Sequence, residues 1–371
     1  MSAPFAPPQR GVRKRILLVA AALVLSWLAA VAILGRHALP PAPQAPPPVI
    51  PSQLATAEGG CPTPPPVRVY FAPPQPDDPD PIDQALLRLI NSAQTSVNCA
   101  FYELGLPIVA DALVSRHQAG VRVGIVSDSD YADRTAVQNC IAAGIPVAFD
   151  ERPAFMHNKF CVVDERFVWT GSTNITENCM YKNNNNSMLI EAADLAKDFA
   201  AEFSEMFQAH RFGSGSPRNT PFPEVALSDG THIECYFAPE DDAGDALVRF
   251  AESARERIDF AAFSFTSREL AEAMEARIQA GVRVRGVFEK RGANAPSSRY
   301  QWLGEHGAAV QTDTNPANLH DKFLVVDSTA VATGSFNFSR NADERNDENL
   351  LVIHNPAVAA KYVGEVDRLM N

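Results

Sequence analysis

The sequence lacks the residue spacings that most often mark a zinc site. It contains no HExxH motif and no CxxC pair, and no third ligand follows at helical spacing. We therefore expect no metal ion and no other cofactor. Cys161 lies in an apolar stretch and is expected to be a buried thiol. Export would allow some of the cysteines to pair, without indicating which; the six are Cys61, Cys99, Cys140, Cys161, Cys179 and Cys235.

Basic residues are also scarce. The 371-residue chain has 32 Lys and Arg against 44 Asp and Glu. From residue 67 onward the count is 27 against 43, a balance of −16. Proteins that bind long polyanions usually present a basic surface. The composition therefore disfavours a nucleic-acid partner, although a local basic groove would still be compatible with one.

One long apolar run, residues 16–35, follows a basic tail at residues 1–15. About 20 apolar residues span a bilayer core, and basic residues before the run favour a cytoplasmic N-terminus. We expect a single-pass membrane anchor that leaves the body of the chain on the extracytoplasmic side, periplasmic or extracellular. The alternative is a cleaved signal peptide, with a cleavage site at Ala30-Val31-Ala32. Residues 36–66 are proline-rich and are expected to form an extended linker.

From residue 67 the pattern alternates between short β-branched runs and amphipathic stretches, which predicts an α/β fold. Expected strands include residues 67–71, 96–101 and 121–128, and expected helices include residues 82–93 and 106–120. The order then repeats: residues 276–287 echo residues 115–126, and the shift is 161 positions. We therefore expect two similar units, at residues 67–215 and 216–371, each with a mixed sheet flanked by helices.

The repeat is closest in two segments of 18 residues. HNKFCVVDERFVWTGSTN (157–174) and HDKFLVVDSTAVATGSFN (320–337) agree at 11 positions, and every shared polar residue keeps its offset. The apolar residues 160–163 and 323–326 are expected to be buried strands. Packing alone does not explain conserved offsets of polar residues within a repeat. We therefore interpret the polar residues as one catalytic set supplied by both units.

The repeated residue types suit a phosphate diester. Two imidazoles can carry covalent chemistry and proton transfer, while ammonium, hydroxyl and amide groups can bind the phosphate oxygens. The candidate catalytic residues are His157, Lys159, Asp164, His320, Lys322 and Asp327. The candidate phosphate-binding residues are Ser172, Asn174, Ser335 and Asn337, and the glycine before each serine is expected to let the backbone approach a ligand. For the two aspartates a structural role at the strand end is an alternative.

These residues resemble a known signature. The pattern HxK-x4-D-x6-G-S, present at His157 and again at His320, is similar to the HKD motif of the phospholipase D superfamily, in particular its bacterial endonuclease and mitochondrial cardiolipin hydrolase branch. The resemblance implies two α/β units related by a pseudo-twofold axis with one active site between them. It also implies a phosphohistidine intermediate without a metal. With both motifs in one chain, we expect activity as a monomer.

The superfamily often has a glutamate that orients the catalytic histidine. Glu348 follows His320 by 28 residues, but the equivalent position in the first unit is Asn185. A carboxylate favours the charged imidazole more than an amide does. On the premise that each unit serves its own histidine, we expect His157 to be the nucleophile and His320 the acid. Alternatively Asn185 is a neutral change and the nearby Glu191 compensates.

Several functions fit this pattern. We expect a phospholipase D-type hydrolase acting on phospholipid head groups, because an anchor would hold the body near lipid. The alternatives are a metal-independent endonuclease, a cardiolipin synthase-like phosphatidyltransferase, and a non-catalytic phosphate-binding protein. Phe155, Met156 and Trp169 are expected either to shape the pocket mouth or to lie in the core. The other histidines have no assigned role; they are His37, His117, His210, His232, His306 and His354.

Overall fold

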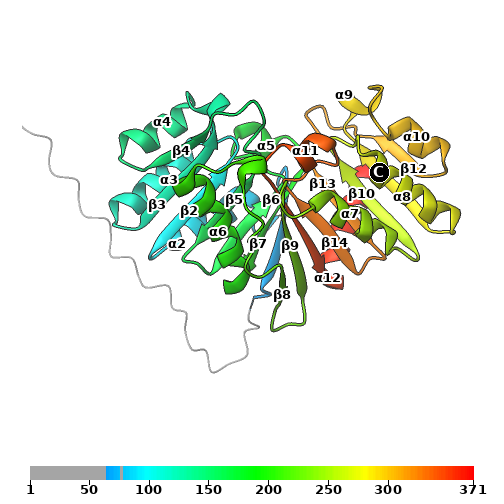
Figure 1. Ribbon diagram of the computed structural model, residues 1–371, viewed down its shortest axis with the longest axis horizontal. Coiled ribbons are helices and arrows are strands. Elements are labelled where there is room, and N and C mark those ends of the chain that lie inside the picture. The colour runs from blue at the N-terminus through cyan, green and yellow to red at the C-terminus, as the bar shows by residue number, and fades with distance from the viewer. Residues whose placement is uncertain (1–63, 76–77) are drawn as a thin grey trace, which may run out of the picture. The chain divides into compact units, whose positions relative to one another are not determined.

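Strands and helices alternate along the chain as predicted, in a computed structural model that describes residues 64–75 and 78–371 (Figure 1). The first half contains β1 (Val67–Ala72), α2 (Ile82–Ser92), β2 (Ser96–Phe101), α3 (Pro107–Gln118), β3 (Arg122–Asp128), η1 (Ser129–Tyr131), α4 (Thr135–Ala142), β4 (Val147–Asp150), β5 (Lys159–Val163), β6 (Phe167–Gly171), α5 (Glu177–Tyr181), β7 (Asn185–Glu191), α6 (Ala193–Ala209) and η2 (Gly213–Gly215). The second half contains β8 (Glu224–Ala226), β9 (His232–Ala238), α7 (Ala243–Glu252), β10 (Arg257–Ala262), α8 (Arg268–Gln279), β11 (Arg283–Phe288), α9 (Lys290–Ala293), α10 (Tyr300–Glu305), β12 (Ala309–Thr312), β13 (Lys322–Val326), β14 (Ala330–Gly334), α11 (Arg340–Glu344), β15 (Glu348–His354) and α12 (Pro356–Met370).

Local sequence explains these elements. In α2 the buried residues Ile82, Leu86 and Leu89 recur at helical spacing and form one apolar face. The helix α12 begins with a proline at its first position, and the Asn355 side chain accepts hydrogen bonds from two backbone N–H groups of its first turn. The motif strand β5 is buried at all five positions, as a continuous apolar run predicts. The α/β prediction is therefore confirmed.

Each half contains a mixed sheet, and the two sheets have the same strand order. The first runs β1-β7-β6-β5-β2-β3-β4, and the second runs β8-β9-β15-β14-β13-β10-β11-β12, with β8 as an additional edge strand. In both, the three strands at one end are parallel and the others are antiparallel. The motif strands β5 and β13 therefore occupy equivalent central positions.

The two sheets share a hydrophobic core. One buried cluster includes residues of α2, α3 and α4, another includes residues of α7, α8 and α10, and a third contains side chains of both sheets together with α6 and α12. Figure 1 labels these helices. In this third cluster Phe199 of α6 makes edge-to-face contacts with Phe160 of β5 and Phe237 of β9, with ring centroids 5.0 and 5.1 Å apart. The helix α12 makes the corresponding contacts from the second half, through Tyr362. The shared core thus fixes β5 and β13 within one compact unit.

The predicted tail, the predicted anchor and all but the last three residues of the predicted linker lie outside the described residues. Over residues 64–75 and 78–371, no helix combines the length and hydrophobicity needed to cross a bilayer.

Candidate active site

The two histidines of the repeated motifs lie where the halves meet. The backbone N–H of His157 donates to the carbonyl of Asp347, at 2.9 Å. The backbone N–H of His320 donates to the carbonyl of Asn184, at 2.8 Å. Each motif is therefore bonded to the segment that precedes the last strand of the opposite half. Because each histidine is bonded to the backbone of the opposite half, both imidazoles lie at the boundary between the two halves.

The orienting residues are exchanged between the halves as well. Nδ1 of His157 lies 2.7 Å from Oε2 of Glu348, and Nδ1 of His320 lies 2.9 Å from Oδ1 of Asn185. The premise that each half serves its own histidine is therefore wrong, because β15 begins beside His157 and β7 begins beside His320. Glu191 does not compensate for Asn185, since its carboxylate pairs with Arg166 at the far end of β7.

Both imidazoles have a defined tautomer. The carboxylate of Glu348 only accepts hydrogen bonds, so Nδ1 of His157 carries the hydrogen. Asn185 donates through Nδ2 to the carbonyl of Cys179, which leaves its Oδ1 to accept from His320. The Nε2 atom of each neutral ring consequently keeps its lone pair. Such a nitrogen can attack an electrophile or accept a proton.

Burial and nearby charges set the protonation of the two rings. Burial lowers the pKa of His157 to about 4, with Glu348 opposing the shift and Lys159 adding to it. The pKa of His320 is also lowered, by burial and then by the charges of Lys322 and Lys159. Without ligand both rings are therefore neutral near pH 7. A bound phosphodiester anion offsets the lysine charges and raises both pKa values.

The two lysines are almost completely buried. Nζ of Lys159 donates to the carbonyl of His157, at 2.6 Å, and lies 4.9 Å from the ring centroid of Tyr102. Lys322 repeats these contacts with His320, at 2.7 Å, and with Phe263, at 5.0 Å. Burial lowers the pKa of Lys159 to about 7 and that of Lys322 to about 8, with Glu348 opposing both shifts. Two buried ammonium groups with one nearby carboxylate form a strong anion site.

The serines and glycines of the motifs act differently from the prediction. Gly171 does not approach a ligand but the neighbouring strand: a Cβ at this position would lie 2.3 Å from the carbonyl oxygen of Asn186. The hydroxyl of Ser172 donates to Oδ1 of Asn185 and so orients it. Ser335 and Gly334 occupy the equivalent positions against Asn349. The hydroxyl of Ser335 also bonds to the carboxylate of Glu348, so both serines support the orienting residues.

The side chains of the motif asparagines each have a hydrogen-bond acceptor without a partner among the described residues. Oδ1 of Asn174 and Oδ1 of Asn337 are buried without a hydrogen-bond partner in the described part of the chain. An unpaired buried polar atom is costly and is common at functional sites. Both side chains therefore remain candidates for contact with a ligand.

The two motif aspartates lie at the other end of their strands. The carboxylate of Asp164 accepts hydrogen bonds from the backbone N–H groups of Gln94, Thr95 and Ser96. Asp327 accepts equivalent bonds from residues 255–257. Of the two interpretations the geometry supports the structural one. These carboxylates fix the turn before β2 and the turn before β10.

Replacing Asp164 by Asn is expected to lower the free energy of unfolding by about 1–3 kcal/mol, because backbone donors lose a charged acceptor. Activity at a temperature where the variant is folded should change little. Burial raises the pKa of Asp164, but the N–H bonds outweigh it and lower the pKa overall. The stabilisation is therefore present above the unfolded pKa of about 4 and is lost as the pH falls through the folded value. Urea unfolding at pH 7 and pH 3 measures this; a loss of activity without loss of stability would contradict it.

Aromatic residues surround the site, and sequence patterns missed two of them. The rings of Tyr102 and Phe263 lie 4.8 and 4.7 Å from those of His157 and His320. Phe155 is 40% exposed beside His157 and can shape an entrance, whereas Met156 and Trp169 are core residues. The signal for Tyr102 and Phe263 was their equivalent position directly after β2 and β10.

Cys161 is a buried free thiol, as predicted.

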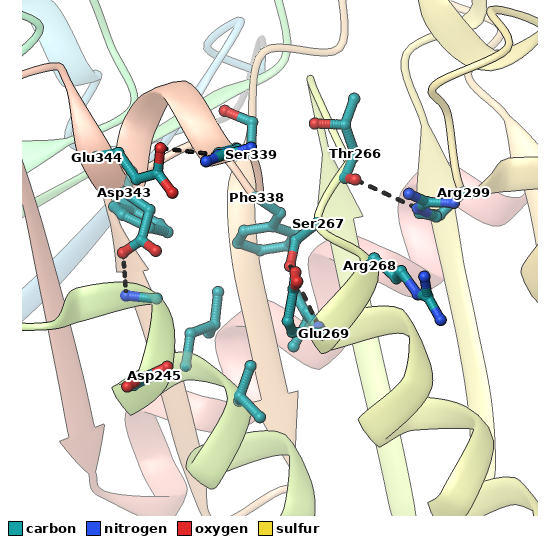
Figure 2. A pocket seen from close by; sticks show the side chains of 16 residues that line it. Asp245, Thr266, Ser267, Arg268, Glu269, Arg299, Phe338, Ser339, Asp343 and Glu344 are labelled. Carbon is teal, nitrogen blue, oxygen red and sulfur yellow. Dashed lines mark hydrogen bonds and ion pairs between the residues drawn. The ribbon is translucent and has the colours of Figure 1, made fainter.

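A separate hollow lies in the second half, between α7, α8 and α11, with a volume of about 490 Å³ (Figure 2). Of the described residues that line it, none is a motif histidine or lysine. Several of its polar groups already have partners: Asp343 accepts from a backbone N–H group, and Arg299 donates to the carbonyl of Thr266 (Figure 2). We assign the chemistry to the histidine site and not to this hollow.

Sequence comparison finds one family in both halves. The family model described as "Cardiolipin synthase, PLD-like domain" matches residues 86–207 and 247–370. Human mitochondrial cardiolipin hydrolase is 34% identical over 125 residues, which are 33% of this chain and 50% of that protein. Phospholipase D of Rickettsia prowazekii is 29% identical over 133 residues, 36% of this chain and 65% of that protein. The chain thus spans about half to two thirds of the length of these relatives.

One solved structure supports the fold over most of the chain. Phosphatidylserine synthase of Haemophilus influenzae covers 81% of this chain and 86% of its own, with a TM-score of 0.64 at 13% identity, and shows the same fold. The phospholipase D family member Nuc of Salmonella typhimurium is 31% identical and covers 38% of this chain and 95% of its own, with a TM-score of 0.37.

Proposed function

The chain belongs to the phospholipase D superfamily, and from that premise we propose that it is a phosphodiesterase that hydrolyses phospholipid head groups through a phosphohistidine intermediate. The observation that carries the proposal is the exchange of contacts between the halves. Each motif histidine is oriented by the other half, and each keeps its Nε2 free. Two imidazoles and two buried ammonium groups therefore serve one phosphate.

The reaction follows from these groups. Nε2 of one histidine attacks phosphorus, and the bond to the head-group oxygen breaks while the second histidine, as imidazolium, protonates that oxygen. Lys159 and Lys322 stabilise the charge on the other phosphate oxygens. The second histidine, now neutral, then takes a proton from water, and the resulting hydroxide displaces the first histidine from phosphorus. The products are a phosphatidic acid and the free head-group alcohol.

The exchange of partners reverses the sequence argument, which would now make His157 the acid, and we assign His157 as the nucleophile on a different ground. The attacking imidazole gains positive charge as the bond to phosphorus forms, whereas the acid loses positive charge. A carboxylate therefore stabilises the transition state more behind the nucleophile than behind the acid. Glu348 lies behind His157, and the neutral amide of Asn185 lies behind His320. The amide also lets His320 release its proton more readily.

Replacing Glu348 by Gln is expected to lower kcat by roughly 10²- to 10³-fold, the usual effect of removing one electrostatic contact to developing charge. Glutamine keeps an acceptor for Nδ1 of His157, so the change removes charge more than geometry. Steady-state hydrolysis of a soluble phosphodiester measures the effect. A change of less than about fivefold would contradict the role of Glu348.

The matched control is Asn185→Asp, which places a carboxylate behind His320. It is expected to raise the pKa of His320 and so to move the part of the rate–pH profile that reports His320 toward higher pH. The loss of kcat should be smaller than for Glu348→Gln. If the two substitutions had equal effects on kcat, the two histidines would be equivalent.

Three observations support lipid as the substrate. The body of the chain is strongly acidic, which disfavours nucleic acid. The exposed ring of Phe155 beside His157 is suited to contact with acyl chains or the lipid surface. The similar proteins are named cardiolipin hydrolase and phospholipase D. In this proposal the apolar residues 16–35 anchor the chain, and the body acts as a monomer on the extracytoplasmic side.

The test offers the full-length chain, purified in detergent and kept in chelator, two substrates in parallel. One is vesicles of phosphatidylcholine, phosphatidylglycerol and cardiolipin, and the other is single-stranded DNA. We expect phosphatidic acid and released head groups from the vesicles only. Oligonucleotides without phosphatidic acid would overturn the lipid proposal in favour of an endonuclease. New cardiolipin from phosphatidylglycerol would instead indicate a transferase.

A further inference from the structure

A cluster of metal-binding side chains lies at the end of β15 that is remote from the catalytic residues. His232, the first residue of β9, pairs directly with His354, the last residue of β15. Glu234 follows His232 by two positions, so its side chain lies on the same face of β9. Nε2 of His354 is 2.7 Å from Oε1 of Glu234. One ligand atom from each of these three residues lies within 4.8 Å of the others.

A fourth donor comes from the edge strand. Glu224 of β8 pairs directly with Glu234, and its Oε2 lies 3.6 Å from Nε2 of His232. Two carboxylates directly opposite each other on neighbouring strands repel, and a cation between them would remove this repulsion. Three strands thus bring two imidazoles and two carboxylates to one face of the sheet, with Glu224 3.6 Å from one member of the cluster.

The donor set fits zinc. Four-coordinate Zn²⁺ binds imidazole nitrogen and carboxylate oxygen at about 2.0–2.2 Å, which separates neighbouring ligand atoms by roughly 3.4 Å. The ligand atoms of His232, Glu234 and His354 lie at most 4.8 Å apart, so small side-chain rotations reach this value, and the carboxylate of Glu224 rotates further to join them. The strand ladder of β8, β9 and β15 already fixes all four backbones. All four side chains are at least partly exposed, so an ion can enter from solvent.

We propose that His232, Glu234 and His354 bind a divalent transition-metal ion of the Zn²⁺ class, with Glu224 as the fourth ligand. A site filled by four protein ligands has no open position for substrate and is structural. The ion ties β8, β9 and β15 together at the edge of the second sheet. Glu348, at the other end of β15, is six residues away, or about 20 Å along a strand. The proposal is therefore independent of the proposed function.

The test is direct binding of Zn²⁺ to the full-length chain after treatment with chelator. A His157→Asn/His320→Asn background removes the catalytic imidazoles as competing ligands. Calorimetric titration is expected to show one equivalent of Zn²⁺, and His232→Ala or His354→Ala should weaken it at least about 100-fold. Saturating Zn²⁺ should raise the Tm of the background protein by roughly 5 °C, but not that of these two variants.

The matched control is His306→Ala. His306 also faces one carboxylate, with Nε2 3.7 Å from Oε1 of Glu275, but the metal-binding group found among the described residues does not include it. This variant should keep both the stoichiometry and the Tm shift. The proposal is overturned if no stoichiometric binding occurs, or if binding survives the loss of both His232 and His354. Either result would reduce the cluster to a surface ion pair.

Discussion

Replacing His157 or His320 by Asn is expected to lower kcat for phospholipid hydrolysis by roughly 10⁴-fold or more, and replacing both should cost little beyond either single change. In the proposed mechanism each ring performs a different step, and their Nδ1 atoms are held by different partners. Residues that act as one unit in this way show strongly non-additive losses. Asparagine can still donate to Glu348 or Asn185, so the fold should survive. Phosphatidic acid release from vesicles gives the rates, and circular dichroism checks the fold.

The control for this prediction is His306→Asn, a half-buried histidine of the second half outside the catalytic site. It should retain close to full activity. Losses that multiply in the double variant would show that the two histidines act at separate sites. A single variant with a tenth of normal activity would show that its ring is dispensable.

Replacing Lys159 or Lys322 by Met is expected to lower kcat/KM by roughly 10²- to 10³-fold each, since each ammonium stabilises charge on the phosphate oxygens. Methionine keeps the length and apolar stem of lysine, so packing against Tyr102 or Phe263 is largely retained. Initial rates with a soluble phosphodiester measure the loss. A drop of less than tenfold for both variants would contradict the anion site.

The pH dependence gives the same prediction a second readout. The pKa values of about 7 and about 8 mean that the ligand-free site loses positive charge as the pH rises through this range. Therefore kcat/KM should fall above about pH 7, while kcat, which reports the substrate complex, should fall at higher pH because the bound anion favours the charged lysines. In Lys322→Met the alkaline fall of kcat/KM should occur at higher pH, because the charge of Lys322, which lowers the pKa of Lys159, has been removed. A profile that does not change on this substitution would rule out the lysines as its source.

Much of the fold could be predicted from the sequence, because local patterns determine it. The apolar residues 96–101 and 160–163 mark buried strands, and the equal spacing in both halves gives the duplicated α/β architecture. The two histidines and two lysines were also accessible, since only a shared site explains their repeated offsets. In these cases the signal lies in residues that are close in sequence, or in the comparison of one half with the other.

The exchange of partners between halves could not be predicted in this way. The position of Glu348, 28 residues after His320, suggests a partner within the same half, yet it contacts His157 across 191 positions. The β-strand order and the shared core under α6 and α12 decide this contact, and neither is a local property. The proposed metal site could not be predicted from local sequence either, because His232 and His354 meet only through the pairing of β9 with β15. Motif spacings on helices do not detect ligands that a strand ladder brings together.

The central claim is that two imidazoles from the two halves divide one phosphoryl transfer between them. The most direct measurement is phosphoenzyme formation with bis(4-nitrophenyl) phosphate, whose leaving group needs no acid. The His320→Asn variant should release close to one equivalent of 4-nitrophenolate and then stall, because the base for the second step is missing. After a quench in alkaline denaturant, mass spectrometry should place the phosphoryl group on His157, and His157→Asn should show neither burst nor label. A label on His320 in His157→Asn would contradict the assignment of the nucleophile, and absence of any phosphohistidine in both variants would contradict the mechanism itself.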